Sequence, residues 1–325
     1  MKKELILVDA SWVIHRMWHV HSNLSVTLKN GVELKSGHIY GFARLLKTLT
    51  TGYPEADIIV CLDGKATHGK ELNPDYKGNR EHGVVKTAFD DLGVLIECVV
   101  AFNNVKVAFN KDLEADEIIS YLCDTESLNY ASTIVYSADG DMVQLLDSRT
   151  FIAKEFDKGL LKLVDENTYY TDEKYVSKFC ACKIDCLPLY RAMVGDSSDN
   201  LPGFPRLRKK LAKEVSEKYK TVENIVGAVD VDTTFPEGFK DFLTTLKTNF
   251  EIMKLPNASD LVYRGVVPRF YENRDSSIAS SLFSLYRIRS ASPVPTFEVT
   301  DELEETLLKV RDDVNFVWKH PNSSK

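Results

Sequence analysis

Short apolar runs alternate with helical patterns through the first half of the chain. Helical periodicity is found near residues 37–51, 82–92 and 114–129, and the apolar runs cover residues 5–8, 58–62, 94–100 and 133–136. Apolar runs of this length are typical of strands that are buried on both faces of a parallel sheet. The alternation predicts strand–helix units with right-handed crossovers, and hence an α/β fold with a mostly parallel central sheet flanked by helices.

The second half of the chain follows a different pattern. After about residue 167 the apolar spacing is mostly helical, through roughly residue 255. We expect a short strand at 260–264, a helix near 276–287 and a disordered end at PNSSK. Cys180, Cys182 and Cys186 fall in a stretch that we expect to be an apolar helix, and their spacing is not that of a zinc site, so we interpret them as core thiols.

The overall composition is that of an ordinary globular protein. Hydrophobic residues make up 44% of the 325 positions and charged residues 27%. No apolar run approaches the roughly 18 residues that a membrane span needs, and the first apolar stretch is too short for a signal peptide. We therefore expect a cytoplasmic protein without membrane contact.

The net charge of −7 argues at first against a protein that binds nucleic acids. Its distribution weakens that objection, because residues 206–220 contain seven basic residues and two acidic ones. Such a stretch favours a phosphate-binding face. The chain has neither a lysine-containing phosphate loop nor a nucleophile elbow, so ATP use and acyl transfer are not expected.

Eight carboxylates stand in short clusters, and most of these clusters lie at predicted strand ends or helix starts. Three of them, Asp9, Asp63 and Asp139, each follow a predicted strand, and the carboxyl ends of parallel strands face one crevice. Carboxylates gathered there would raise one another's pKa values unless cations held them together, and hard divalent ions prefer oxygen ligands. The pattern predicts a two-metal phosphodiester site. The full set is Asp9, Asp63, Glu114, Asp116, Asp139, Asp141, Asp196 and Asp199.

Six sequence strings give this prediction a family context. They are LVDASWVIHRMWH, GHIYGFARLL, CLDGKATHGKELNPDYKGNR, EADEI, SADGDMVQL and GDSSDNLPG, in that order. Through these strings, over roughly residues 3–255, the chain resembles the 5′-nuclease (flap endonuclease) family. It looks most like the free-standing bacteriophage 5′-3′ exonucleases and the 5′-nuclease domain of family A DNA polymerases.

The resemblance implies a metal site made of two groups of ligands, with two or more Mg²⁺ or Mn²⁺ ions as cofactors. It also implies that Asp116, which lies near both groups, and Asp139 are catalytic. The first group matches Asp9, Asp63, Glu114 and Asp116, and the second matches Asp139, Asp141, Asp196 and Asp199.

The resemblance further implies contacts with a single-stranded 5′ arm. Tyr76, Lys77 and Arg80 match family residues at a short arch, which we expect near residues 65–92. Tyr76 would offer a ring on which an unpaired base stacks. Lys77 and Arg80 are implied as catalytic cations that reach the phosphate being cut.

Beyond the last carboxylate the chain departs from the family pattern. Arg206 and Arg208 stand where the family's helix-hairpin turn has glycines. Those glycines form a backbone cradle that can carry a monovalent ion, and we expect side-chain phosphate contacts in its place. The residues expected to contact nucleic acid here are Arg206, Arg208, Lys209, Lys210 and Lys213.

Three parts are expected: a PIN-like nuclease core at 1–167, a helical helix-hairpin-type duplex-binding region at 168–290 that completes the metal site, and a C-terminal tail segment at 291–325. The implied activity is metal-dependent 5′-3′ exonuclease and flap endonuclease cleavage of DNA, or of RNA primers on DNA, in phage replication. Expected partners of a monomer are DNA with a 5′ flap or 5′ end, RNA–DNA hybrids and replication proteins. The alternatives are an RNase H-like or junction nuclease with RNA preference, a replisome-interaction protein, and a non-catalytic DNA-junction binder.

Overall fold

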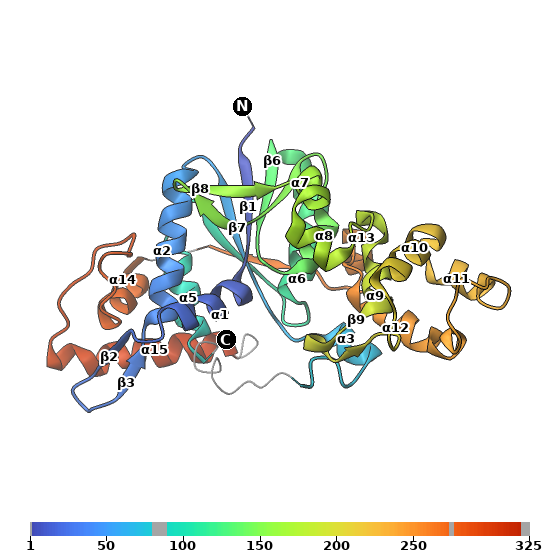
Figure 1. Ribbon diagram of the computed structural model, residues 1–325. Coiled ribbons are helices and arrows are strands. Elements are labelled where there is room, and N and C mark those ends of the chain that lie inside the picture. Colours follow the sequence, from blue (N-terminus) through green and yellow to red (C-terminus); the bar gives the residue numbers. More distant parts are fainter. Residues whose placement is uncertain (1, 80–89, 273–275, 320–325) are drawn as a thin grey trace.

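A seven-stranded sheet forms the centre of the computed structural model, which describes residues 2–79, 90–272 and 276–319 (Figure 1). From edge to edge the strands are β11 (Arg269–Tyr271), β5 (Val105–Phe109), β4 (Asp57–Leu62), β1 (Glu4–Asp9), β6 (Ser132–Tyr136), β7 (Thr150–Asp157) and β8 (Leu160–Val164). The five inner strands run parallel, and β11 and β8 are antiparallel at the two edges. The structure confirms the α/β class and the mostly parallel sheet.

Both faces of the central strand β1 are fully buried, and this burial explains its unbroken apolar run. Ile6 and Val8 contribute to the hydrophobic core on one side of the sheet. Leu5 and Leu7 contribute to a second core on the opposite side. Two helical layers therefore cover the sheet, as the alternation of strands and helices predicts.

The first layer carries the N-terminal helices together with the C-terminal part of the chain, on the left in Figure 1. Its helices are α1 (Ala10–Val20), α2 (Gly37–Gly52), α5 (Leu92–Val99), α14 (Ser276–Leu285) and α15 (Asp301–Lys319), with a hairpin of β2 (Ser25–Thr27) and β3 (Glu33–Lys35) between α1 and α2. The last helix, α15, packs on α5 and α14. Segments that are about 200 residues apart in sequence thus share one core.

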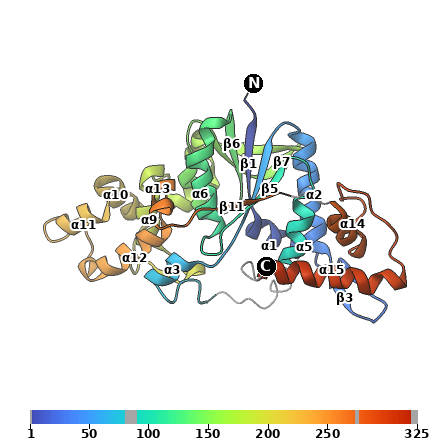
Figure 2. The same ribbon diagram turned by 180° about the vertical axis from the view of Figure 1, so that it is seen from behind.

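The second layer begins with α6 and continues into a helical region that extends away from the sheet (Figures 1 and 2). Its elements are α6 (Ala115–Glu126), α7 (Glu166–Thr171), α8 (Glu173–Phe179), α9 (Leu187–Val194), α10 (Lys209–Tyr219), α11 (Val222–Ala228), α12 (Leu243–Met253) and α13 (Ala258–Tyr263), with α3 (Thr67–Leu72) beside α12. The helical pattern after residue 167 is confirmed. None of the helices in the described ranges combines the length and apolar character of a membrane span.

Two predicted strands are wrong. Residues 94–100 lie largely in α5, which is buried on almost every side, and a run of this length that is apolar at every position but one has no periodicity that separates helix from strand. The strand next to β4 is instead β5, which was not predicted. Residues 260–264 belong mainly to α13, which begins with a capping box formed by Asn257 and Asp260. The edge strand β11 follows a few residues later.

The helices predicted over 37–51, 114–129 and 276–287 are confirmed within a few residues. Most of the helix predicted over 82–92 lies outside the described part of the chain. The final PNSSK residues also lie outside it. The apolar helix predicted around the three cysteines is interrupted, because Cys180 and Ala181 take positive φ values of 56° and 49°. Two of the three thiols, Cys182 and Cys186, are nevertheless buried in the second core.

Candidate functional site

The candidate site lies at the carboxyl edge of the sheet, where the strand order reverses. The chain runs outward from β1 through β4 to β5, and then returns to the other side of β1 with β6 and β7. Asp9 ends β1, Asp63 follows β4 directly, and Asp139 stands three residues after β6. This topology therefore brings three carboxylates from distant parts of the sequence to one crevice.

Asp9 is the most buried of these carboxylates, with 7% of its surface exposed. Its Oδ1 accepts a hydrogen bond from the Trp12 backbone N–H at 3.1 Å, which caps α1, and its Oδ2 accepts one from the Ser137 hydroxyl at 2.7 Å. Burial raises the pKa of Asp9 to about 7, and the negative charges of Asp63 and Asp139 contribute to that increase.

Glu114 and Asp116 come from the first turn of α6. Glu114 caps the helix in a reciprocal capping box with Glu117, while Asp63 Oδ1 accepts a hydrogen bond from the Ala115 backbone N–H at 2.5 Å. The amino end of α6 thus fixes Asp63 beside the α6 carboxylates. Burial raises the pKa of both Glu114 and Asp116; neighbouring carboxylates raise it further, and Lys77 opposes the increase.

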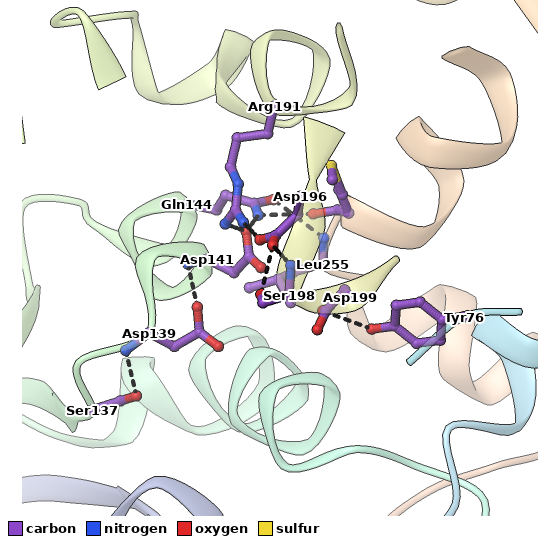
Figure 3. A network of polar contacts seen from close by, with 11 residues as sticks. Tyr76, Ser137, Asp139, Asp141, Gln144, Arg191, Asp196, Ser198, Asp199 and Leu255 are labelled. Carbon is purple, nitrogen blue, oxygen red and sulfur yellow. Dashed lines mark hydrogen bonds and ion pairs between the residues drawn. The ribbon is translucent and has the colours of Figure 1, made fainter. Parts of the chain in front are cut away.

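The second group of carboxylates gathers around Arg191, a buried arginine of α9 (Figure 3). Its guanidinium contacts Asp141 and donates to Asp196 Oδ2 at 2.7 Å. Burial acts to raise the pKa of Asp196, but hydrogen bonds from Ser198 and the charge of Arg191 outweigh it and hold that pKa below its usual value. Asp139 joins this group because its Oδ1 accepts from the Asp141 backbone N–H at 3.0 Å.

A tight loop presents Asp196 and Asp199. Its two ends form a short antiparallel pair, β9 (Gly195–Asp196) and β10 (Leu201–Pro202), and residues 197–199 make one 3-10 turn between them. Gly195 has a φ of +80°, and a Cβ on Gly203 would lie 2.0 Å from the Val194 carbonyl oxygen. Both glycines are required because the backbones at the base of the loop touch.

Tyr76 and Lys77 connect the two groups. The Tyr76 hydroxyl lies 3.3 Å from Glu114 Oε2 and 3.5 Å from Asp199 Oδ2, and the Lys77 ammonium contacts Glu114. The Lys77 backbone N–H donates to the Asp199 carbonyl oxygen at 3.0 Å. Tyr76 is only 5% exposed, so stacking of a base on its ring requires the residue to be uncovered first. Arg80 lies outside the described residues.

The sequence did not identify two residues that organise this site, Ser137 and Arg191. The Ser137 hydroxyl donates to Asp9 and accepts from the Asp139 backbone N–H at 3.0 Å, so it links β1 with β6. Nothing in the sequence marks that serine. Arg191 has a weak signal, because it is the one basic residue in the apolar helix LPLYRAMV directly before Gly195.

The carboxylates of both groups would suit hard divalent ions. In the structure, however, a lysine and an arginine of the chain itself lie against some of these carboxylates. Among the described residues, no three Asp, Glu, His or Cys side chains are arranged to hold a metal ion as they stand. Lys77 lies against Glu114, and Arg191 lies against Asp141 and Asp196. These side chains offer only oxygen atoms as donors. Burial and neighbouring negative charges raise the pKa of Asp9, Glu114 and Asp116, and a divalent cation would relieve both effects.

The predicted basic face follows the loop of the second group. Arg206 has a φ of +58°, a left-handed conformation that favours glycine, and Arg208 is the residue before α10. Four of the five predicted contact residues, from Arg206 to Lys210, are exposed, and Lys213 is half-buried. Positive charge therefore lies at the amino end of α10, close in sequence to Asp199.

Comparison with known proteins gives this site a context. The family described as 5′-3′ exonuclease, N-terminal resolvase-like domain, matches residues 4–180. A 5′-3′ exonuclease of Aquifex aeolicus is 28% identical over 264 residues, which are 80% of this chain and 84% of that protein. The DNA polymerase I of Geobacillus stearothermophilus is 28% identical over 232 residues, 71% of this chain, which spans only a quarter of the polymerase's length.

The fold has a solved counterpart. A structure described as divalent metal ions (zinc) bound to the 5′-exonuclease of bacteriophage T5 superposes with a TM-score of 0.61 at 16% identity. The superposition covers 95% of this chain and 100% of that one. At this level of identity the likeness concerns the fold, and it extends through both layers described above.

Proposed function

The chain belongs to the 5′-3′ exonuclease family, a family of nucleases, and on that premise we propose that it is a metal-dependent 5′-nuclease. It would hydrolyse phosphodiester bonds at 5′ ends and 5′ flaps in DNA, or in RNA primers paired with DNA, during phage replication. The observation that carries this proposal is the meeting of two carboxylate groups at the carboxyl edge of the sheet, where Ser137 bridges Asp9 and Asp139.

The carboxylates supply the binding chemistry. Asp9, Asp63, Glu114 and Asp116 would hold one ion, and the group of Asp139, Asp141, Asp196 and Asp199 would hold another, with Mg²⁺ or Mn²⁺ as the ions. When bound, such ions lower the pKa of water and stabilise negative charge on the phosphate and the leaving oxygen. The Ser137 and Ala115 hydrogen bonds orient the Asp9 and Asp63 oxygens before any ion arrives.

Lys77 is the residue that we assign to the phosphate. Its ammonium lies on Glu114 within the site, and a phosphate entering there would compete for it as an acceptor of charge-assisted hydrogen bonds. Arg80, three residues further on, is proposed to act on the same phosphate. The Tyr76 hydroxyl, placed between Glu114 and Asp199, keeps the two groups at a fixed separation.

The basic face at the start of α10 is proposed to grip the duplex next to the cleaved bond. Its five residues are Arg206, Arg208, Lys209, Lys210 and Lys213. Long cationic side chains, rather than close backbone approach, would make the phosphate contacts, so binding should depend steeply on salt. This contact positions the duplex without reading its sequence.

A labelled flap substrate tests the proposal. A 5′-labelled flap duplex is incubated with Mg²⁺, with Mn²⁺ or with EDTA, and the matched control is Asp139→Asn/Asp141→Asn. We expect product with either metal, none with EDTA, and a loss of at least a hundredfold in the double variant. Equal cleavage by the double variant and the parent would overturn the assignment. An RNA-primed version in the same assay separates an RNA-preferring nuclease from a DNA flap nuclease.

A further inference from the structure

Helix α12 is joined by hydrogen bonds to both halves of the second carboxylate group. One half is the turn that holds Asp139 and Asp141, and the other is the β9–β10 loop. The helix packs on α9, and its last residue, Met253, is buried in the second core. Residues 254–257, which we call the α12–α13 linker, then lead the chain into α13.

Asn249 joins α12 to the β9–β10 loop. The residue is 1% exposed, and its Nδ2 donates to the Ala192 carbonyl oxygen at 3.1 Å and to the Pro202 carbonyl oxygen at 2.8 Å. Ala192 precedes the loop and Pro202 ends it, so one amide group holds the chain on both sides of the loop. A buried amide that uses both of its N–H donors fixes the backbone that it binds. The position of α12 therefore governs that of Asp196 and Asp199.

Gln144 joins the end of α12 to the other half of the group (Figure 3). Its Nε2 donates to the Met253 carbonyl oxygen at 2.9 Å and to Asp141 Oδ1 at 3.4 Å, and its Oε1 accepts from the Leu255 backbone N–H at 3.2 Å. Gln144 and Asp141 are three residues apart in the 3-10 helix Gly140–Leu145, where side chains at this spacing lie above one another. Glutamine suits this place because it has both donors and an acceptor, whereas an ionised glutamate cannot donate and a lysine cannot accept.

We propose that α12 is a spacer that sets the distance between the two halves of the second group, and that Gln144 is the positioning residue that orients Asp141 for metal binding. Asn249 and Met253 are four residues apart, so their contacts lie about 6 Å apart along the helix. Groups that hydrogen-bond to a ligating carboxylate fix its direction and so affect the affinity for the ion. The inference rests on the proposed function and deepens it, because it assigns ion binding partly to residues outside the eight carboxylates.

The α12–α13 linker has another anchor, which does not involve the carboxylates. The Ser120 hydroxyl of α6 donates to the Pro256 carbonyl oxygen at 2.8 Å, and Ser120 is buried. If Gln144 only held the linker, the loss of either contact would affect ion binding alike. If Gln144 acts through Asp141, only the loss of Gln144 would weaken it.

Mn²⁺ binding to the metal-free chain, without DNA, tests this inference when free Mn²⁺ is followed by electron paramagnetic resonance. The variant is Gln144→Met, which keeps the length of the side chain and removes its donors and acceptor. Ser120→Ala is the matched control. Asp141→Asn, with and without Gln144→Met, shows whether the effect passes through Asp141. If circular dichroism shows that Gln144→Met does not fold, Gln144→Ala takes its place, because water can fill this half-buried position.

Gln144→Met should bind one Mn²⁺ ion about tenfold more weakly than the parent and should bind the remaining ions as the parent does. Ser120→Ala should bind every ion like the parent. In the Asp141→Asn background, Gln144→Met should weaken binding by less than about twofold, because the two changes remove the same interaction. On a flap duplex, Gln144→Met should lower kcat about tenfold at limiting Mn²⁺ but little at saturating Mn²⁺, with KM for DNA unchanged.

Three results would each overturn the inference: parental Mn²⁺ affinity in Gln144→Met, an equal loss in Ser120→Ala, or the full loss in the Asp141→Asn background. The proposed function would survive any of them, provided that the parent cleaves the flap duplex with Mn²⁺. If the parent neither binds Mn²⁺ nor cleaves the flap, the proposed function fails, and the role of Gln144 falls with it.

Discussion

Arg191 lies against Asp141, although 50 residues separate the two in sequence, and the same guanidinium donates to Asp196. The arginine is 8% exposed and comes from a helix that is otherwise part of the core. Two partly buried carboxylates therefore share one cation that belongs to the chain. This arrangement makes Arg191 the internal counter-ion of the second carboxylate group, in the place where we propose that a divalent ion binds.

Replacing Arg191 with methionine should make the fold depend on divalent ions. In EDTA the variant leaves two partly buried carboxylates without their cation, and we expect the free energy of unfolding to fall by about 3 kcal/mol. Mn²⁺ should restore more stability to Arg191→Met than it adds to the parent, because it replaces the lost charge. Urea titrations with EDTA and with Mn²⁺ measure both effects, and Arg191→Lys is the control that keeps the charge. An equal gain from Mn²⁺ in Arg191→Met and the parent would refute this role.

Replacing Lys77 with methionine should slow the chemical step more than it weakens binding. If the Lys77 ammonium stabilises charge that develops on the phosphate, its loss should lower kcat by about 10²–10³-fold with little change in KM. Lys70→Met, at an exposed position on α3, provides a matched control. A rise in KM at constant kcat would instead mean that Lys77 only binds the substrate.

The metal-free fold should lose stability as the pH rises between about 4 and 7. Asp9 has its pKa raised to about 7, from an ordinary value of 3.8, so the folded chain keeps a proton that the unfolded chain has released. Stability from this group is complete below pH 3.8 and is lost as the pH rises through 7. Asp9→Asn, which does not titrate, should flatten the dependence when unfolding is followed by urea in EDTA. A parent and variant with identical pH slopes would show that Asp9 ionises normally.

Replacing Arg206 with glycine should have opposite effects on the stability of the fold and on the binding of DNA. A glycine adopts a φ of +58° without the steric cost that an L-residue bears there, so Arg206→Gly should stabilise the fold by about 1 kcal/mol. The same change removes a cation from the basic face. Arg206→Gly/Arg208→Gly should bind duplex DNA more weakly, with a salt slope shallower by about 2. An unchanged or steeper slope would show that these arginines do not contact phosphates.

The sequence predicted the parts of the fold that depend on local pattern. The runs in β1, β4 and β6 are bounded by polar residues and buried on both faces, and the acids that follow them lie at one edge, as parallel topology requires. The run in α5 could not be assigned in this way. It is apolar at every position from Val94 to Ile96 and at Cys98 and Val99, so only its packing between α2, α15 and the sheet decides that it is a helix.

Contacts between segments that are distant in the chain could not be predicted from the sequence. The link from Asp9 through Ser137 to Asp139, and the pairing of Arg191 with Asp141, depend on side chains that meet only after the sheet and α9 are assembled. The contacts of Gln144 with the end of α12 likewise form only once that helix is in place. A residue's charge can be read from a single sequence, but its neighbours cannot.

Anomalous diffraction from crystals grown with Mn²⁺ would locate the metal ions that the eight carboxylates are proposed to bind. We expect at least two anomalous peaks, one bounded by Asp9, Asp63, Glu114 and Asp116 and one bounded by Asp139, Asp141, Asp196 and Asp199. We also expect that the Lys77 ammonium has left Glu114 and that Arg191 has moved away from Asp141. A map without peaks in either group, with both cations still on their carboxylates, would contradict the assignment of this site as a two-metal nuclease centre.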